Sequence, residues 1–490
     1  MNKTLLTLAL ALGTVASAFA ATPEDNREFR GAWMHTVYQG QYKRNNTEQN
    51  QAYLISQLDS LKAMGVNAIL FQVRPSADAF YASSHEPWSR FLTDGGKAPQ
   101  PYWDPLEFMV EESHKRGMEL HAWLNPYRVT TSPNEKLPAG HIYNRHPERF
   151  ITYDGKIYFD PALPENRQFI TDVVEDIVSR YDIDAIHFDD YFYPYPAKVD
   201  FPDDASYTKY GNGMDRGDWR RNNVDVLIKG LNEKIKSIKP WVRFGISPFG
   251  IFRNKKNVEW GSETNGLSNY DDLYADVLLW NREGWIDYLL PQLYWELEHK
   301  NASYLTLIDW WNRYAGQNGG HLYIGQDVNR TMTKKDLEPS TDKNQLHHKV
   351  DLTRSLENVS GNCWWPGYSL TANIGGVADS LMTSVQARPA IVPAYKNLKS
   401  AGPKPVENVG LEGTLISWTP VATGDAIEDA VRFVVYTMDS PEQIDQPESW
   451  DIVEITGVPA YNAPKAGTYV ITALDRVNNE SEPSAAVVVE

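Results

Sequence analysis

Eight short apolar segments alternate with amphipathic segments between Glu28 and Leu370, and this alternation limits the choice of fold more than any other feature of the sequence. Apolar segments of this kind predict strands buried on both faces, as in parallel sheets covered by helices. Eight strand–helix pairs in about 360 residues predict an α/β fold, a (β/α)8 TIM barrel with enlarged loops. A doubly wound sheet is the competing fold, but no glycine-rich first turn supports it. The expected strands are Phe29–Val37, Ala68–Pro75, Glu119–Pro126, Asp184–Tyr193, Val242–Phe249, Tyr288–Trp295, Leu322–Val328 and Asn362–Tyr368.

The pattern changes where several prolines follow the eighth strand–helix pair. Beyond them the chain has short strands separated by turns, which predict a small all-β sandwich. We therefore expect a barrel domain over residues 28–388, a linker over 389–405 and a sandwich over 406–490. The strand containing Trp418, the Val-Val-Tyr strand ending at Tyr436 and the run ALDRVNNESEPS make this last domain similar to a fibronectin type III module.

The N-terminal residues predict an exported protein. Residues 1–20 contain a basic start, an apolar run and the ending Ala18-Phe19-Ala20, which is typical of a secretory signal peptide. No later run is long and apolar enough to span a bilayer, so we expect a periplasmic or extracellular protein without a membrane anchor. The formal net charge of -17 argues against nucleic-acid binding, because such proteins usually carry basic patches. The single cysteine, Cys363, cannot form an intramolecular disulfide.

One expected strand ends in a cluster of acidic and aromatic residues. The stretch Asp184–Pro194 begins as a buried apolar strand and continues as Asp-Asp-Tyr-Phe-Tyr-Pro. Side chains alternate between the two faces of a strand, so His187, Asp189 and Tyr191 share one face. Asp190 points away from Asp189 if the strand remains regular. Because TIM-barrel enzymes carry their catalytic groups at the carboxyl ends of the strands, this stretch is interpreted as an active-site strand.

A second carboxylate comes from the sixth expected strand, which places Gln292, Tyr294 and Glu296 on one face. Carboxylates on facing strands converge at the barrel mouth, so Asp189 and Glu296 are the candidate catalytic pair. Such a pair in an aromatic-rich pocket predicts glycoside hydrolysis, in which one acid protonates the leaving oxygen and the other group supports the oxocarbenium-like transition state. We assign Glu296 as acid/base and Asp189 as nucleophile or charge stabiliser, and Asp190 is a third catalytic candidate.

The substrate contacts are expected from polar and aromatic side chains near the same strand ends. Aromatic rings offer apolar faces on which sugar rings can stack, and amide, imidazole and guanidinium groups can bind hydroxyl and acetamido groups. The candidates are Arg74, His121, Trp123, Asn125, Tyr127, Arg128, His187, Tyr191, Tyr193, Gln292, Tyr294, Trp295 and Trp364.

Five runs of residues carry a family resemblance. They are FRGAW at 29–33, FQVRP at 71–75, HAWLNPYR at 121–128, HFDDYFYP at 187–194 and PQLYW at 291–295. In this order and spacing, the chain resembles the bacterial family-10-like hypothetical glycosyl hydrolases over most of the expected barrel. The resemblance implies a TIM barrel, and some members of that family act on peptidoglycan glycan strands that lack stem peptides. It implies an N-acetylated polysaccharide as the substrate.

The active-site strand is also similar to the Asp-Gly-x-Asp-x-Asp-x-Glu pattern of chitinases. Asp184 and Asp189 match acidic positions of that pattern, but His187 and Tyr191 stand where an Asp and the catalytic Glu would be. This departure weighs against a chitinase-type mechanism, and it leaves open a participation of the substrate acetamido group with Glu296 as the acid.

Two alternatives belong to other functional classes. A metal-dependent deacetylase or hydrolase could use His35, His121, His187 and Asp189, since zinc sites take such ligands. A glycan-binding protein without activity could use the aromatic residues and the sandwich for adhesion. The leading interpretation needs no cofactor and no metal, and it predicts a monomer that binds a polysaccharide.

Overall fold

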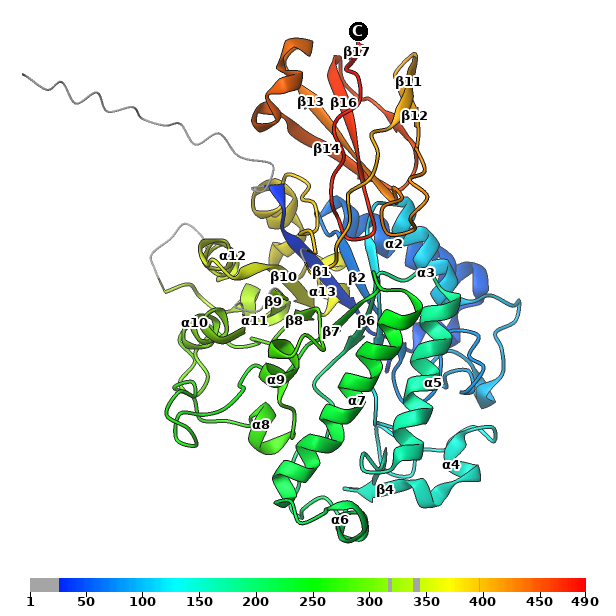
Figure 1. Ribbon diagram of the computed structural model, residues 1–490, viewed down its shortest axis with the longest axis vertical. Coiled ribbons are helices and arrows are strands. Elements are labelled where there is room, and N and C mark those ends of the chain that lie inside the picture. Colours follow the sequence, from blue (N-terminus) through cyan, green and yellow to red (C-terminus); the bar gives the residue numbers. More distant parts are fainter. Residues whose placement is uncertain (1–25, 316–319, 338–343, 396) are drawn as a thin grey trace, which may run out of the picture.

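A closed barrel of eight parallel strands forms the centre of the molecule (Figure 1), in the order β1-β10-β9-β8-β7-β6-β3-β2. The computed structural model describes residues 26–315, 320–337, 344–395 and 397–490. The expected signal peptide at residues 1–20 lies outside the described residues. The predicted TIM barrel is confirmed. Its strands are β1 (Phe29–Met34), β2 (Ala68–Arg74), β3 (Glu119–Leu124), β6 (Ala185–Phe188), β7 (Arg243–Ile246), β8 (Tyr288–Leu289), β9 (His321–Asp327) and β10 (Val359–Trp365).

Helices surround the barrel, and several begin and end where the sequence provides caps. The side chain of Asn46 accepts a hydrogen bond from the backbone of Gln49 at the start of α2, and Asp104 caps α3, whose first residue is proline. Gly65 and Gly117 follow these helices with positive φ angles, which glycine adopts without strain. The helices are α1 (Gln41–Arg44), α2 (Thr47–Ala63), α3 (Pro105–Lys115), α4 (Ile142–Arg145), α5 (Pro164–Arg180), α6 (Asp204–Tyr210), α7 (Arg216–Ile238), α8 (Asn269–Asp272), α9 (Val277–Arg282), α10 (Tyr304–Ala315), α11 (Val328–Thr333), α12 (Leu346–Ser355), α13 (Gly367–Thr371) and α14 (Val377–Ser380).

Strand alternation separates two cores. Ile186 and Phe188 of β6 pack in the large core between the strands and the helices. Ala185 of the same strand belongs to a smaller cluster along the barrel axis, together with Phe29, Trp33 and other inward-facing residues. The period-2 pattern of the active-site strand is therefore realised, with alternate residues of β6 facing the barrel interior.

A two-stranded hairpin, β4 (Phe150–Tyr153) and β5 (Lys156–Phe159), is inserted between β3 and α5 (Figure 1). Its turn is Asp154-Gly155, and both residues have positive φ angles. Asp-Gly at such a turn is a strong hairpin signal that the sequence analysis did not use. The backbone nitrogen of Phe159 donates to the carbonyl of Tyr127 (2.9 Å), which joins the hairpin to the chain that leaves β3.

The C-terminal region is all-β, as predicted. Two sheets enclose a core that includes Ile416, Trp418, Phe433 and Ile471. Its similarity to fibronectin type III and the domain boundaries at 388 and 405 stay predictions. One sheet has the order β11-β12-β15 and the other β14-β13-β16-β17, with strands β11 (Glu407–Glu412), β12 (Leu415–Thr419), β13 (Arg432–Met438), β14 (Asp451–Thr456), β15 (Ala460–Asn462), β16 (Gly467–Leu474) and β17 (Val487–Val489).

The sandwich packs against the end of the barrel where the strands begin. The guanidinium of Arg432 contacts Asp184 at 3.1 Å and Glu119 at 3.5 Å, and all three residues come from or just precede strands. Arg476 forms a second ion pair with Asp182 at 2.7 Å, on the surface beside them. In Figure 1 the sandwich stands at the top of the view, and β4 and α6 lie at the bottom. The open mouth of the barrel therefore faces away from the sandwich.

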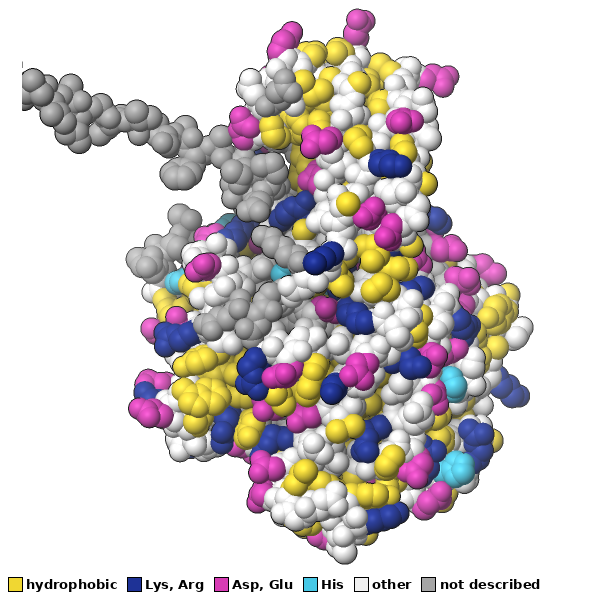
Figure 2. Space-filling model, in the orientation of Figure 1, with side chains coloured by type: hydrophobic (Ala, Val, Ile, Leu, Met, Phe, Trp, Pro, Cys, Tyr) yellow, Lys and Arg dark blue, Asp and Glu magenta, His cyan; other side chains and the backbone are white. Residues whose placement is uncertain are grey.

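The outer surface mixes charges of both signs. On the face shown in Figure 2, Lys and Arg side chains are interspersed with Asp and Glu side chains. Within the described part of the chain, none of the helices has the length and apolar character needed to cross a membrane.

Candidate active site

A cavity of about 450 Å³ opens at the carboxyl ends of the barrel strands. Such positions hold the active sites of TIM-barrel enzymes. The cavity combines two carboxyl groups with aromatic rings and a few amide and hydroxyl groups. Its lining residues are Trp33, His35, Val37, Tyr38, Gln72, Trp123, Arg128, Asp189, Asp190, Tyr191, Tyr195, Ser247, Gln292, Tyr294 and Trp365.

Asp189 and Asp190 both reach this cavity because the strand stops before them. Strand β6 ends at Phe188, and the backbone bends at Asp190, so strict alternation no longer applies. Asp190 was expected to point away from Asp189 in a regular strand, and the structure corrects that expectation. Both side chains are almost fully buried, with exposed fractions of 3% for Asp189 and 2% for Asp190. Two acids in one enclosed site influence each other's ionisation.

Asp189 is held by donors from β3 and from the segment that follows β3. The indole of Trp123 donates to its Oδ2 (3.1 Å), and the amide of Asn125 donates to the same oxygen. Arg128 in turn donates to the amide oxygen of Asn125 (2.6 Å) and fixes that amide. Burial raises the pKa of Asp189, and the charge of Asp190 raises it further, to about 7. The carboxyl is thus poised to hold a proton near neutral pH.

Asp190 has a different set of partners. The side chain of Gln292 donates to its Oδ1 (3.1 Å), and the hydroxyl of Tyr195 donates to its Oδ2. Burial raises the pKa of Asp190, while these two hydrogen bonds lower it in part. The two neighbouring acids therefore sit in distinct environments, which is how enzymes assign different roles to paired carboxyl groups.

The cavity floor leads into a row of hydrogen-bonded rings along the barrel axis. The indole nitrogen of Trp33 donates to Nε2 of His187 (3.2 Å), and Ser247 Oγ lies 3.2 Å from the same nitrogen. Because an indole can only donate, we assign Nε2 as the acceptor and Nδ1 as the protonated nitrogen. Nδ1 lies 2.9 Å from the hydroxyl of Tyr288, to which it donates.

The row continues to the opposite end of the barrel. The hydroxyl of Tyr288 donates to Nδ1 of His121 (2.9 Å), and Nε2 of His121 donates to Glu119 (3.0 Å). Burial lowers the pKa of His121, and it lowers that of His187 well below the usual value, so both rings are neutral. Neither imidazole lines the cavity. These two predicted substrate contacts belong instead to the filling of the barrel.

The structure brings together about half of the residues predicted for the site. Asn125 contacts Asp189 directly from behind the cavity wall. Seven predicted residues line the cavity, namely Trp123, Arg128, Asp189, Asp190, Tyr191, Gln292 and Tyr294.

Glu296 does not line the cavity, so the expected pair of Asp189 and Glu296 is not assembled there. Its side chain is about a quarter exposed and lies 3.8 Å from Lys334. Burial acts to raise the pKa of Glu296, but a backbone hydrogen bond and nearby positive charges, including that of Lys334, together outweigh it and lower the pKa. The prediction assumed a regular strand up to Trp295. Strand β8 ends at Leu289, and the chain bends at Trp295, so the alternation that would aim Glu296 inward is lost.

Four other residues that were predicted to bind substrate lie in the interior of the protein instead. Arg74 is buried, and it pairs with Glu86 at 2.6 Å. The rings of Tyr127, Tyr193 and Trp364 are buried in the large core. These side chains are not among those that line the cavity, and the structure corrects the expectation that they bind substrate.

The two tryptophans at the end of β10 show why the predicted residue Trp364 lies outside the cavity while its neighbour Trp365 lines it. Cys363 faces the barrel interior, so Trp364 faces the helices and Trp365 faces inward again, where it lines the cavity. The backbone at Gly361 has a φ angle of 144°, and the register shifts between Val359 and Asn362. Trp295 is likewise outside the cavity lining, and its ring packs edge-on against Phe249 with centroids 5.5 Å apart.

Several lining residues were not among the predicted contacts. Tyr195 binds Asp190, and Tyr38 stands at the rim with 67% of its surface exposed and a positive φ angle of 60°. A tyrosine with positive φ is uncommon and is often found at functional sites. The proline-interrupted run from Tyr191 to Pro196 was the signal that could have revealed Tyr195.

The residues of the metal-dependent alternative do not assemble into a site. Within the described ranges, no group of three or more His, Cys, Asp or Glu side chains is arranged to hold a metal ion. The ring nitrogens of His187 and His121 are occupied by the hydrogen bonds of the axial row. The donor set proposed from His35, His121, His187 and Asp189 is therefore dispersed.

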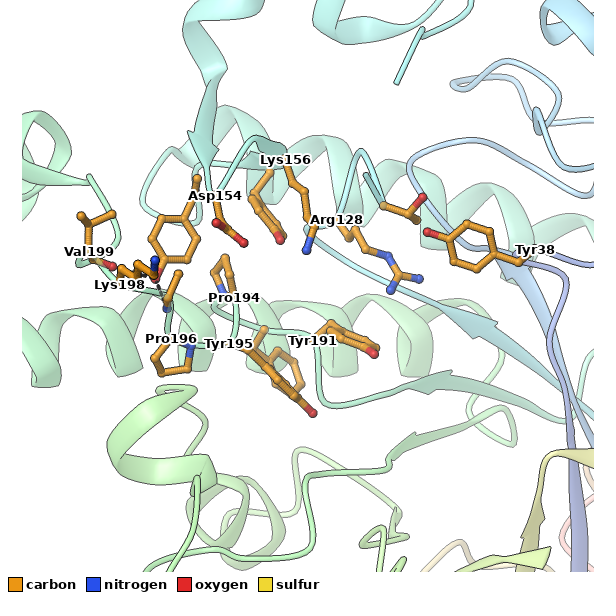
Figure 3. A pocket seen from close by; sticks show the side chains of 15 residues that line it. Tyr38, Arg128, Asp154, Lys156, Tyr191, Pro194, Tyr195, Pro196, Lys198 and Val199 are labelled. Carbon is orange, nitrogen blue, oxygen red and sulfur yellow. Dashed lines mark hydrogen bonds between the residues drawn. The ribbon is translucent and has the colours of Figure 1, made fainter. Parts of the chain in front are cut away.

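A second cavity of about 720 Å³ adjoins the first and is shown in Figure 3. Tyr38, Arg128, Tyr191 and Tyr195 line both cavities, so the two are continuous. Its far part lies between the β4–β5 hairpin and the loop that follows Asp190.

Comparison with known proteins places this site in a family. The sequence matches the model of the glycosyl hydrolase-like 10 family over residues 28–340, which is more than half of the chain. The chain belongs to the glycosyl hydrolase-like 10 family. The glycosyl hydrolase YngK of Bacillus subtilis (strain 168) is 37% identical over 501 residues, covering 98% of this chain and 97% of that protein. The glycosyl hydrolase DigH of Escherichia coli (strain K12) is 36% identical over 368 residues, covering 70% of this chain and 83% of that protein.

A solved structure with a similar fold is the PgaB (BpsB) glycoside hydrolase domain from Bordetella bronchiseptica. It is 13% identical, with a TM-score of 0.47, and the match covers 72% of this chain and 98% of that domain. Membership of the glycosyl hydrolase-like 10 family confirms the predicted resemblance, and it identifies the chain as a glycoside hydrolase.

Proposed function

We propose that this glycosyl hydrolase-like 10 protein is an exported enzyme that cleaves glycosidic bonds in peptidoglycan glycan strands lacking stem peptides, with Asp189 and Asp190 as its catalytic carboxyl groups. The observation that carries the proposal is the placement of two buried, neighbouring acids in an aromatic cavity at the barrel mouth. Glycoside hydrolysis uses two carboxyl groups near the bond that breaks.

Asp189 fits the role of general acid. Its pKa is raised to about 7, so the side chain retains a proton near neutral pH. Both strong donors, Trp123 and Asn125, point at Oδ2, and among the described residues Oδ1 accepts only a long hydrogen bond from the backbone of Tyr191 (3.4 Å). A proton on Oδ1 can be transferred to the leaving oxygen of a glycoside in the cavity, and the resulting carboxylate would be stabilised by the two donors.

Asp190 fits the role of the charged partner. Its carboxylate accepts hydrogen bonds from Gln292 and Tyr195, which stabilise the charged form. A negative charge at this position would stabilise the positive charge that develops on the sugar ring, or would orient an acetamido group that attacks the anomeric carbon. The two acids thus divide the proton transfer and the charge stabilisation.

The rest of the cavity suits an uncharged sugar ring. Trp123, Tyr294 and Trp365 offer aromatic faces, and Gln72, Ser247 and Gln292 offer amide and hydroxyl groups for ring substituents. The peptide-free glycan is the substrate class that the family resemblance implies, and residues 1–20 support export.

The proposed function is tested with purified, mature protein and peptide-free glycan strands. New reducing ends should accumulate over time, and the products should be soluble oligosaccharides with a defined end residue. Glycan that binds the protein but yields no new ends would contradict hydrolysis and favour the binding-protein alternative. The same assay in excess chelator should give an unchanged rate, and a lost rate would favour the metal-dependent alternative.

A pair of variants separates the two carboxylate assignments. Asp189→Asn should abolish the release of reducing ends, whereas Glu296→Gln should retain the rate within about threefold, since a partly exposed side chain outside the cavity contributes little to the transition state. Circular dichroism would establish that both variants fold. A severe loss in Glu296→Gln with full activity in Asp189→Asn would return the catalytic role to Glu296.

A further inference from the structure

The outer cavity carries positive charge next to two catalytic acids. Its lining includes Arg128, Lys156 and Lys198 but only one carboxylate, Asp154. The whole chain has a formal net charge of -17. A local excess of cations on such a protein is not explained by its composition, and grooves lined by one sign of charge concentrate ligands of the opposite sign.

The two lysines are not engaged in ion pairs. Among the described residues, no carboxylate lies within ion-pair distance of Lys156 or Lys198. Arg128 is bound through neutral groups, because it donates to the carbonyl of Pro75 (2.9 Å) and to the amide of Asn125 (2.6 Å). Arg128, whose charge also acts on Asp189 and Asp190, forms no ion pair among the described residues. The two lysines, with Arg128 beside them, can therefore attract an anionic group of a ligand.

The cavity is built by two segments that hold each other in place. The hydroxyl of Tyr153 on β4 donates to the carbonyl of Val199 (2.9 Å) and accepts from the backbone nitrogen of Ala197 (2.6 Å). Figure 3 shows Lys156 and Asp154 descending from the hairpin towards Tyr191, Pro194 and Tyr195 on the opposite loop. Because the Tyr153 hydroxyl ties hairpin and loop together, the two walls keep a fixed separation.

Aromatic rings line the outer cavity beside the charged side chains. Tyr191 and Tyr195 stack with centroids 5.7 Å apart, and the guanidinium of Arg128 lies 4.7 Å from the centroid of the Tyr191 ring. Tyr158 adds a further ring on the hairpin side. Rings that offer faces, combined with nearby cations, form a surface for a sugar that carries an anionic substituent.

We infer that the outer cavity is a binding subsite for a sugar that carries a free carboxylate, adjacent to the sugar whose bond is cleaved. This inference rests on the proposed function. In a glycan strand without stem peptides, each N-acetylmuramic acid has a free lactyl carboxylate. In a strand with stem peptides, the same carboxyl group is an amide and carries no charge. Lys156, Lys198 and Arg128 would therefore favour the peptide-free strand through a group that the stem peptide removes.

The test compares matched oligosaccharides by calorimetric titration with the full-length Asp189→Asn protein, which prevents turnover. One oligosaccharide is peptide-free with lactyl carboxylates, and the other has those carboxyls reduced to alcohols. The carboxylate form should bind about tenfold more tightly, as expected for two or three exposed ion pairs. The preference should diminish when salt is raised, because salt screens exposed charges.

Replacing Lys156 and Lys198 by glutamate tests whether these two residues cause the preference for the carboxylate form. Lys156→Glu/Lys198→Glu should abolish the preference for the carboxylate form, whereas Lys399→Glu/Lys465→Glu, with the same change of net charge at exposed positions outside the cavity, should retain it. Equal binding of both oligosaccharides by the unreversed protein would overturn the inference. A uronic-acid oligosaccharide that binds as tightly as the peptide-free glycan would overturn the assignment to a lactyl carboxylate.

The proposed hydrolysis and the proposed subsite can be rejected independently of each other. Absence of cleavage by the protein with Asp189 intact, together with a preserved preference for the carboxylate form, would reject the proposed hydrolysis and leave the subsite in place. Cleavage of both oligosaccharides at equal rates, with no effect of the double charge reversal on either, would reject the subsite and leave the hydrolysis in place.

Discussion

The two ends of the barrel hold buried carboxyl groups with opposite properties. At the mouth, burial raises the pKa of Asp189 to about 7, with a further contribution from the charge of Asp190. At the base, burial also acts to raise the pKa of Glu119, but the charge of Arg243 and a hydrogen bond from His121 outweigh it, and the pKa is lowered to about 2. Asp189 is 3% exposed and Glu119 is 0% exposed, so burial does not distinguish them.

Neighbouring cations explain why the pKa of Glu119 is lowered while that of Asp189 is raised. Arg243 and Arg432 both contact Glu119, and Arg432 also contacts Asp184. At the mouth, the hydrogen bonds to Asp189 and Asp190 come from indole, amide and phenol groups, which are neutral. An ion-paired carboxylate joins the two domains, and a carboxyl without an ion pair remains able to exchange a proton. The comparison separates a structural acid from the proposed catalytic acid by the charge of its partners.

The largest expected effect comes from Asp189→Asn. We expect a loss of at least about a thousandfold in kcat, because general acid catalysis contributes on this order. The asparagine oxygen can still accept from Trp123 and Asn125, so the fold should be retained. The measurement is the initial rate of reducing-end release, with circular dichroism as the check of folding.

Asp225→Asn is the matched control for this variant. Burial also raises the pKa of Asp225 to about 7, and its carboxylate accepts a hydrogen bond from the indole of Trp280 (2.6 Å), but it does not line the cavity. This variant should keep the rate within about twofold. A comparable loss in both variants would show that the loss does not depend on a position in the cavity, and it would contradict the assignment of Asp189 as the catalytic acid.

The second effect concerns the base of the barrel. Arg432→Met should reduce the free energy of unfolding by about 3–5 kcal/mol, because it leaves Glu119 and Asp184 buried with fewer cations. Arg476→Met removes an ion pair with the half-exposed Asp182 and should cost less than about 1 kcal/mol. Urea denaturation of both variants gives the comparison. Equal losses would mean that the buried network contributes no more than a surface pair.

A smaller effect is expected from Tyr195→Phe, which removes the hydroxyl that donates to Asp190. The rate should fall by about tenfold, as for the loss of one hydrogen bond to a charged group. Tyr191→Phe keeps the neighbouring ring and removes a hydroxyl that has no carboxylate partner among the hydrogen bonds described, so a loss of about twofold is expected. If the two variants are equally impaired, the stacked rings matter more than the hydroxyl.

The smallest effect is a dependence of stability on pH. The folded-state pKa of Asp189 is raised from 3.8 to about 7, so the native state binds the extra proton and loses stability as pH rises through this range. Asp189→Asn should therefore gain in melting temperature relative to the unsubstituted protein between pH 4 and pH 8. Glu119 acts in the opposite sense, since its pKa is lowered from 4.5 to about 2 and its stabilisation is lost as pH falls through that interval. A melting-temperature difference that is independent of pH would contradict the raised pKa.

Local patterns in the sequence were sufficient for the barrel and for part of its mouth. The buried strands, the caps at Asp104 and Gly117 and the His-Phe-Asp-Asp run depend on residues that are close in the chain, so propensity and alternation predict them. The placement of Asp189 and Trp123 in one cavity followed from the rule that strand ends meet at the mouth.

Irregular backbone and long-range contacts were beyond that reasoning. Glu296 was assigned by extending a strand that ends at Leu289, and Trp364 by ignoring the register shift in β10. The β4–β5 hairpin supplies Tyr158 and Lys156 to the outer cavity, and its Asp-Gly turn was present in the sequence but not used. The contact of Arg432 with Asp184 spans 248 positions, and no local pattern encodes it.

The row of rings along the barrel axis has an indole at one end and a carboxylate at the other. The indole of Trp33 can only give a proton to a hydrogen bond, and the carboxylate of Glu119 can only receive one, so His187, Tyr288 and His121 are left with a single arrangement of hydrogens. Every hydrogen bond in this line points towards Glu119, so a proton passed along it would have to remain on Glu119, whose pKa, despite burial, is lowered to about 2 by the charge of Arg243 and the hydrogen bond from His121. The axis therefore insulates the two ends, and acid–base events above it need not disturb the ion pairs that fasten the C-terminal sheets below.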